Sequence, residues 1–253
     1  MKKLIIFLYG VASYFLFFGV FIYAIFWVGN ILVPNSIDAA PMRPLGDALM
    51  IDVLLVALFG LQHSIMARKS FKSMITKIIP KASERSTYVL MSSIMLGIMV
   101  FFWQPLGGEI WHVESQAGQI ALYALFGLGW SILFLASFLI NHFELFGLQQ
   151  VWHELRNKAA KDAQFKTPFL YKMVRHPIYL GWIIGVWATP IMTVTHLAFA
   201  VLTTTYIFIG VYFEERDLVK ELGMDYVDYK RQVPMIIPGF GRSKTLAPAS
   251  AES

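Results

Sequence analysis

Two pairs of ionisable residues could form one ligand site, although they stand far apart along the chain. A run of 38 consecutive residues contains no Asp, Glu, Lys or Arg. Arg175 and His176 stand at its start, and Glu214 and Glu215 stand at its end. A cation, an imidazole and two carboxylates suit a zwitterionic ligand, and their charges act more strongly where water is partly excluded. The competing interpretation is that each side chain merely ends a membrane helix and reaches into the polar interface. The two pairs meet only if the intervening run folds back on itself.

Long charge-free runs indicate which elements carry these residues. Hydrophobic residues make up 57% of the 253 residues and charged residues 15%, whereas a soluble domain has roughly 25% charged residues. A single helix over the 38-residue run would measure about 57 Å, against a hydrocarbon core of about 30 Å, so the run predicts a helical hairpin. We therefore predict an all-α integral membrane protein, a bundle of five to six transmembrane helices with a C-terminal hairpin. The candidate spans are residues 4–33, 46–67, 87–103, 118–140, 178–192 and 194–213.

The positive charges are distributed unevenly between the predicted loops. If the N-terminus is cytoplasmic, 20 of the 21 Lys and Arg residues lie on the cytoplasmic side and only Arg43 lies outside. Cytoplasmic loops are enriched in Lys and Arg, so this distribution predicts that both termini are cytoplasmic. The chain is then a single membrane domain, 1–253. It comprises a four-span bundle at 1–140, the hairpin and cytoplasmic elements of the ligand site at 141–241, and a disordered tail at 242–253.

Composition argues against several kinds of chemistry. The chain has no cysteine, which excludes disulfides, thiolate metal sites and a cysteine nucleophile. The histidines of the predicted cytoplasmic face lack H-E-x-x-H spacing, so no metal is expected. The net charge of +5 is explained by the membrane asymmetry, so no nucleic-acid partner is expected. No G-x-G-x-x-G follows a strand pattern, so a soluble Rossmann-type nucleotide site is absent.

A more specific pattern begins at Arg175-His176-Pro177-Ile178-Tyr179-Leu180-Gly181 and ends at Glu214-Glu215. It resembles the membrane methyltransferases of the isoprenylcysteine carboxyl methyltransferase family, which have R-H-P-x-Y-x-G at the start of a hairpin and E-E at its end. The match covers about residues 141–238. The resemblance implies that S-adenosylmethionine is the methyl donor, enclosed by the hairpin ends and the following helix. The donor-binding residues that it implies are Tyr171, Arg175, His176, Tyr179, Gly181, Glu214, Glu215 and Tyr229. For Gly181, four residues before Gly185, helix packing is the alternative interpretation.

The N-terminal half carries a second and broader resemblance. The stretches Gln62-His63-Ser64-Ile65-Met66-Ala67-Arg68 and Glu84-Arg85-Ser86-Thr87-Tyr88 are similar to those of the bacterial methanethiol S-methyltransferase branch. This resemblance implies a bacterial inner-membrane enzyme that methylates a small thiol, giving dimethyl sulfide from methanethiol, at the cytoplasmic side. Without a cysteine to relay the methyl group, the transfer is a single in-line displacement.

The proposed chemistry needs a proton acceptor, because the thiolate is the reactive form of a thiol. His176 and His63 are candidate bases, since histidine titrates nearest to neutral pH. Arg175 is the third candidate catalytic residue. His63 and Ser64 are the candidates for the acceptor side of the site.

Three alternatives stay open at this stage. The acceptor could instead be an isoprenylated cysteine carboxylate or a phospholipid amine. The chain could be a non-catalytic membrane protein or a transporter, although transporters usually place charge in the middle of the membrane. A reductase that shares the hairpin and uses NADPH is the third. The sequence leaves the oligomeric state open.

Overall fold

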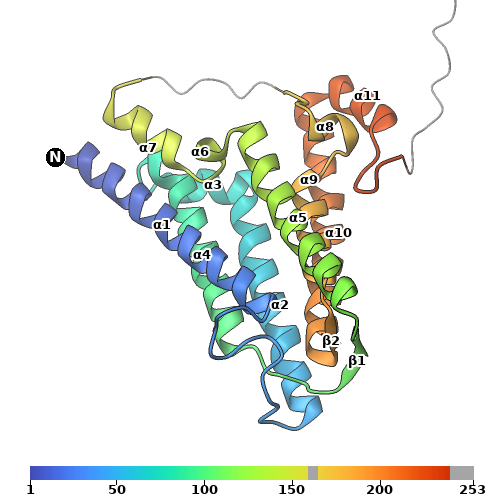
Figure 1. Ribbon diagram of the computed structural model, residues 1–253. Coiled ribbons are helices and arrows are strands. Elements are labelled where there is room, and N and C mark those ends of the chain that lie inside the picture. Colours follow the sequence, from blue (N-terminus) through green and yellow to red (C-terminus); the bar gives the residue numbers. More distant parts are fainter. Residues whose placement is uncertain (159–164, 240–253) are drawn as a thin grey trace, which may run out of the picture.

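The computed structural model describes residues 1–158 and 165–239 and confirms the all-α membrane architecture. Five helices in this part of the chain are long and apolar enough to cross a bilayer, and they run together as a bundle (Figure 1). Large apolar side chains such as Ile5, Leu8 and Phe15 are exposed on its flanks, as expected for a surface that faces lipid. The five helices are α1 (Lys2–Val28), α2 (Leu45–Ala67), α4 (Glu84–Phe102), α5 (Gln116–Ile140) and α10 (Val194–Leu222).

Shorter elements gather at the two ends of the bundle. The end that holds the N-terminus carries the short helices, and the opposite end carries the loop after α1 and a small antiparallel pair of strands (Figure 1). The strands are β1 (Glu109–His112) and β2 (Ile191–Thr193). The short helices are α3 (Lys69–Ile75), the 3₁₀ helix η1 (Lys81–Ser83), α6 (His142–Leu145), α7 (Leu148–Leu155), α8 (Leu170–Met173) and α11 (Met224–Gln232). The predicted disordered tail lies outside the described residues.

The predicted hairpin is present, but its first arm is short. Helix α9 (Pro177–Trp187) has 11 residues, about 16 Å of helix, which is roughly half of the hydrocarbon core. The predicted span 178–192 therefore ends early. Pro190 disfavours helical geometry at Thr189, and the chain then enters β2, which pairs with β1. The sequence pattern predicted a polar turn here but gave no sign of the strands.

Helix α9 is held against α5 by close contact between two backbones. A Cβ atom on Gly181 would lie 2.6 Å from both the carbonyl oxygen of Gly129 and the amide nitrogen of Leu133. A Cβ atom on Gly129 would lie 2.5 Å from the amide nitrogen of Gly185. Only glycine permits this approach. The structure thus places Gly181, a predicted donor residue, in a helix contact that fixes the direction in which Arg175 and His176 enter the site.

Candidate methyl-transfer site

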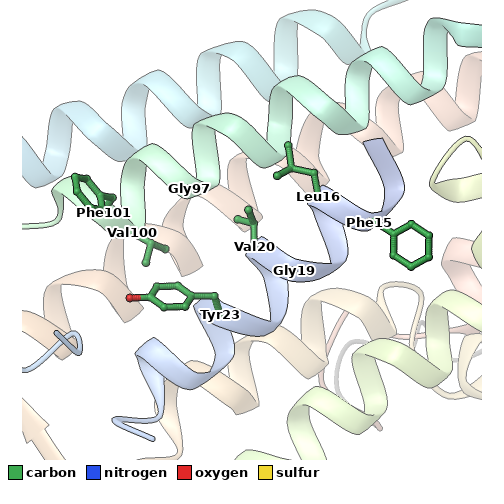
Figure 2. A pocket seen from close by; sticks show the side chains of 8 residues that line it. All are labelled: Phe15, Leu16, Gly19, Val20, Tyr23, Gly97, Val100 and Phe101. Atoms are coloured by element: carbon green, nitrogen blue, oxygen red, sulfur yellow. The ribbon is translucent and has the colours of Figure 1, made fainter. Parts of the chain in front are cut away.

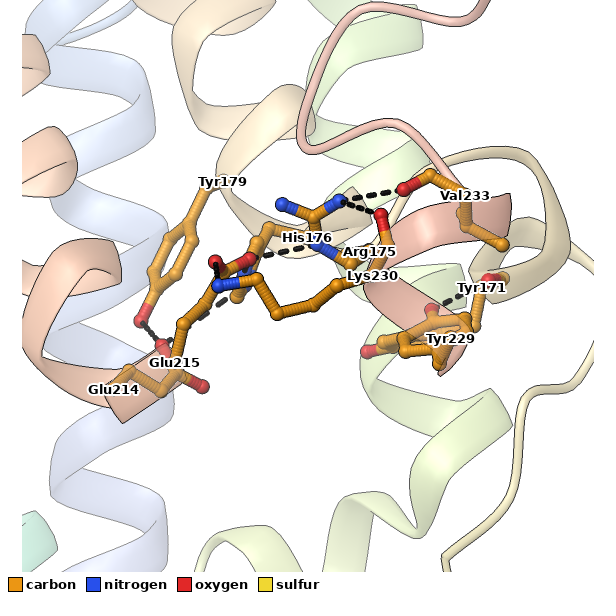
Figure 3. A network of polar contacts seen from close by, with 9 residues as sticks. All are labelled: Tyr171, Arg175, His176, Tyr179, Glu214, Glu215, Tyr229, Lys230 and Val233. Carbon is orange, nitrogen blue, oxygen red and sulfur yellow. Dashed lines mark hydrogen bonds and ion pairs between the residues drawn. The ribbon is translucent and has the colours of Figure 1, made fainter. Parts of the chain in front are cut away.

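The hairpin brings Arg175 and His176 against Glu215, as the sequence predicted. Arg175 Nε donates to Glu215 Oε1 at 2.7 Å, and His176 Nε2 lies 3.1 Å from the same oxygen. Lys230 Nζ, from α11, lies 2.7 Å from the other carboxylate oxygen. Glu215 is only 6% exposed. Three basic groups, two from the start of α9 and one from α11, thus surround one buried carboxylate (Figure 3).

The remaining contacts of Arg175 fasten the segment after α11 to this cluster. Arg175 Nη1 donates to the carbonyl oxygens of Val233, at 2.5 Å, and Lys230, at 3.1 Å. The Arg175 amide donates to Pro234 O at 2.9 Å, and the His176 amide donates to Met235 O at 3.1 Å. Arg175, a predicted catalytic residue, therefore holds α9, α10 and the C-terminal segment together. Removing one partner of a buried ion pair of this kind strongly destabilises the folded protein.

Glu214 differs sharply from its neighbour. Its side chain is 44% exposed, and Tyr179 Oη donates to Glu214 Oε2 at 2.9 Å (Figure 3). The nearer nitrogen of His176, Nδ1, is 4.0 Å from the same oxygen. The His176 ring also lies over the Tyr179 ring, with centroids 5.5 Å apart and planes 25° apart. Glu214 therefore presents a negative charge beside two stacked aromatic faces.

Tyrosines close the side of the site formed by α8 and α11. Tyr229 Oη donates to the carbonyl oxygen of Tyr171 at 2.5 Å (Figure 3), and Tyr171 Oη donates to Ala136 O at 3.4 Å. Burial raises the pKa of Tyr229 to about 12, a rise that the Arg175 cation opposes and the Glu215 charge supports. Burial likewise raises the pKa of Tyr171 well above its usual value. Both phenols are thus neutral at physiological pH and offer hydroxyl donors and aromatic surface.

A second polar cluster, around His63, lies between α2, α4 and α10. Tyr88 Oη is 2.7 Å from His63 Nε2, and Ser92 Oγ is 3.1 Å from His63 Nδ1. Ser64, the other predicted acceptor residue, lies 3.4 Å from Tyr206 Oη. The sequence analysis did not single out Tyr88, Ser92 or Tyr206. Tyr88 stood inside the segment that resembles the methanethiol branch, but nothing in that segment marked the hydroxyl as a partner of His63.

The two clusters are within electrostatic range of each other. The carboxylate of Glu214 acts on Tyr88 and Tyr206, on the His63 side, as well as on Tyr179. His63, Ser64 and the hairpin ends therefore belong to one polar region, at the end of the bundle that carries the N-terminus. This proximity depends on the packing of α2, α4 and α10, which sequence spacing does not reveal.

Known proteins are similar to this chain over both of its halves. The profile of the isoprenylcysteine carboxyl methyltransferase (ICMT) family matches residues 130–220, the part that contains the hairpin. A methanethiol S-methyltransferase from Crocosphaera subtropica is 49% identical over 96% of this chain and 95% of its own. The chain belongs to this methyltransferase family. Similar enzymes of the same name from Mycobacterium tuberculosis and Bradyrhizobium diazoefficiens are 45% and 48% identical, over 94% and 93% of this chain and 98% and 83% of their own. No solved structure matches the chain.

Membership confirms that the chain is a methyltransferase enzyme embedded in a membrane. The relatives extend over α2 and α4, so the His63 cluster falls within the shared region as well as the hairpin. In the described part of the chain, no group of three or more His, Cys, Asp or Glu residues is arranged to hold a metal ion.

Two apolar grooves lie apart from the candidate site. One, of about 400 Å³, runs between α1 and α4 and is lined by residues such as Phe15, Val20 and Phe101 (Figure 2). The other, of about 580 Å³, lies between α1 and α7 and includes Phe7 and Trp152 in its lining. Neither groove contains a residue of the two polar clusters.

Proposed function

We propose that this methyltransferase moves a methyl group from S-adenosylmethionine to methanethiol, giving dimethyl sulfide, at the cytoplasmic side of a bacterial inner membrane. The observation that carries the proposal is the contrast between the two adjacent glutamates. Glu215 is neutralised by three basic groups, whereas Glu214 is exposed beside the Tyr179 and His176 rings. An exposed carboxylate next to aromatic faces suits a cationic ligand.

The residues fit the chemistry of this donor. S-adenosylmethionine supplies an electrophilic methyl group on a positively charged sulfur. Glu214 would hold positive charge of the donor, and the tyrosines Tyr171, Tyr179 and Tyr229 would supply hydroxyl groups and aromatic contact. Arg175, His176 and Glu215 would act by holding the hairpin ends in place, since their polar atoms are engaged with one another and with carbonyl groups. Such positioning contributes a large part of the rate in a single displacement.

The acceptor side of the proposal rests on His63 and Ser64. Both lie in the polar region that contains Glu214, and the relatives whose printed name specifies methanethiol cover this part of the chain. His63 is a better candidate base than His176, because both ring nitrogens of His176 face carboxylates. We extend to this chain the small-thiol acceptor of its relatives.

Sidedness and domain organisation complete the proposal. Of the 21 Lys and Arg residues, 20 lie on one side of the predicted topology, the side that holds the candidate site. The site would therefore face the cytoplasm, within a single membrane domain in which 1–140 supplies the bundle and 141–241 the donor site. A reporter enzyme that is active only in the cytoplasm should be active when it is fused after Ser253. Activity of a reporter that works only in the periplasm would reverse the assignment.

The decisive experiment follows the labelled methyl group. Membranes containing the protein are given methanethiol and S-adenosylmethionine with a deuterated methyl group, and the headspace is analysed by mass spectrometry. We expect dimethyl sulfide that carries one deuterated and one unlabelled methyl group. Parallel incubations contain a prenyl-cysteine or a phospholipid as the only acceptor, and label in those products without label in dimethyl sulfide would contradict the thiol assignment. Calorimetry that shows binding of NADPH but not of S-adenosylhomocysteine would contradict the assignment of S-adenosylmethionine as the donor.

A further inference from the structure

The environment of His63 limits how this residue can act on an acceptor. Its ring is stacked on Phe59, with centroids 5.3 Å apart, and both of its nitrogens are already bonded to hydroxyl groups. Tyr88 Oη lies 2.7 Å from Nε2, and Ser92 Oγ lies 3.1 Å from Nδ1. A substrate thiol would have to displace one of these hydroxyls to reach the imidazole. A direct His63–thiol contact is therefore disfavoured.

We propose that Tyr88 takes the proton from the thiol and passes its own proton to His63, so that Tyr88 is the catalytic residue and His63 the base behind it. This inference rests on the proposed function, because it assumes a thiol acceptor. Ser92 is a positioning residue in the same scheme, since it sets which nitrogen of His63 carries hydrogen.

The two distances favour one arrangement of hydrogens. A phenol is a better donor than an alcohol, and the shorter contact is the one to Tyr88. An O–H···N bond from Tyr88 at 2.7 Å and an N–H···O bond to Ser92 at 3.1 Å both fall within the usual ranges. In this arrangement Nδ1 carries the hydrogen and Nε2 accepts. The lone pair of Nε2 is then aimed at the hydroxyl that would receive the thiol proton.

The position of Tyr88 suits this role. It is 8% exposed, and the Arg85 guanidinium lies 4.9 Å from the centre of its ring. Arg85 is itself fixed by a hydrogen bond from Nε to Leu145 O at 2.7 Å. The Tyr88 side chain is also within electrostatic range of Glu214, the carboxylate that we assign to the donor. The hydroxyl is thus bonded to the base and lies within electrostatic range of the proposed donor side.

The proposed step balances in protons and electrons. The thiol proton moves to Tyr88 Oη while the Tyr88 proton moves to His63 Nε2. The electron pair of the thiol sulfur forms the new bond to the methyl carbon, and the pair of the broken carbon–sulfur bond stays on the leaving sulfur. One positive charge is lost from the leaving sulfonium and one appears on the His63 imidazolium, which still donates from Nδ1 to Ser92. Release of that proton to water restores the resting state.

A phenol is chemically suited to the intermediate position. Its ordinary pKa is about 10, and a simple alkyl thiol is a weaker acid than cysteine, whose pKa is about 8.5. In water the two acids are therefore of similar strength. Transfer onward to an imidazole, whose conjugate acid has a pKa of about 6.5, proceeds only as the sulfur attacks. The relay thus avoids a charged phenolate in the resting enzyme.

The chain contains a matched control for this experiment. Tyr14 Oη lies 2.9 Å from His142 Nε2, and Ser137 Oγ lies 2.8 Å from His142 Nδ1. This second Tyr–His–Ser group makes the same bonds between α1, α5 and α6. Tyr14→Phe therefore removes the same kind of hydrogen bond as Tyr88→Phe, without touching the His63 cluster.

The test compares two thiols of different acidity. With methanethiol, Tyr88→Phe should lower kcat by about 10²-fold or more while the KM for S-adenosylmethionine changes little. With trifluoroethanethiol, which ionises far more readily, the loss should be much smaller, and Ser92→Ala should show the same trend in weaker form. Tyr14→Phe should leave the ratio between the two thiols unchanged. An equal loss for both thiols in Tyr88→Phe and Ser92→Ala would overturn the relay.

A second measurement does not depend on turnover. In protein labelled with ¹⁵N-histidine and saturated with S-adenosylhomocysteine, the His63 resonances are identified by their absence in His63→Gln. Added methanethiol should shift the Nε2 resonance in the wild type and not in Tyr88→Phe. The proposal would be contradicted if the Nε2 resonance of the wild type does not shift when the thiol is added. It would also be contradicted if the shift persists in Tyr88→Phe. Failure of the wild type to methylate any small thiol is a separate result that would defeat the proposed function itself.

Discussion

Replacing Glu215 by glutamine should separate the structural from the binding role of the glutamate pair. The substitution keeps the shape but removes the charge that faces Arg175, His176 and Lys230. Removing one partner of a buried ion pair typically costs about 3–5 kcal/mol, because the remaining charges stay buried and uncompensated. For a chain of this size that corresponds to a fall of about 6–20 °C in Tm. Because Glu215 is only 6% exposed, solvent screening does not reduce the effect appreciably.

The adjacent substitution Glu214→Gln is the matched control. Glu214 is 44% exposed and 4.0 Å from His176 Nδ1, so its contribution to stability should be at most about 1 kcal/mol. It should instead weaken the binding of S-adenosylmethionine. The assays are thermal melting in detergent and calorimetric titration with the donor. If Glu214→Gln melts as early as Glu215→Gln, or if Glu215→Gln melts like the wild type, the division of roles between the two carboxylates is wrong.

Three further predictions concern other parts of the molecule. Gly181→Ala should lower Tm, since overpacking costs about 1–3 kcal/mol, whereas Gly127→Ala, with nothing within 4 Å, should not; equal effects would refute the α5–α9 contact. Burial alone would raise the pKa of the Asp38 carboxyl, but the His196 imidazole, 3.7 Å away, and hydrogen bonds from Thr193 and Asn30 hold it below its usual value. The stability gained is therefore present above about pH 4, the unfolded value, and is lost as the pH falls below it; melting curves should show this, and Asp38→Asn should flatten the profile. His63→Ala should lower kcat by about 10²–10⁴-fold with donor affinity nearly constant, and unchanged turnover per folded molecule would remove His63 from the mechanism.

The sequence was sufficient to predict the hairpin and the meeting of its two ends. A charge-free run far longer than one span must turn back, and this alone brought residues 175–176 to residues 214–215. It did not distinguish Glu214 from Glu215, because the face of α10 that packs inward is known only from the structure. Thr203, Ile207, Val211 and Glu215 are buried at intervals of four residues along α10, which places Glu215 on the inward face of the helix.

Other features depend on contacts that no local pattern records. Tyr88 and Ser92 are one helical turn apart on α4, so they share a face, but their pairing with His63 depends on the register between α4 and α2. The short α9 and the β1–β2 pair likewise follow from how the chain closes at the opposite end of the bundle. Apolar composition predicted that segments cross the membrane, and it carried no information about which residues meet across helices.

The two Tyr–His–Ser groups show why position, rather than motif, decides function in this fold. Both have a histidine whose nitrogens are bonded to a phenol and to an alcohol at 2.7–3.1 Å. His142 is 2% exposed, and its group joins α1, α5 and α6, where it satisfies polar atoms at a helix end. The group at His63 makes the same bonds within electrostatic range of Glu214. Only the second is within electrostatic range of the carboxylate that we assign to the donor, so the proposed route for the proton is placed there.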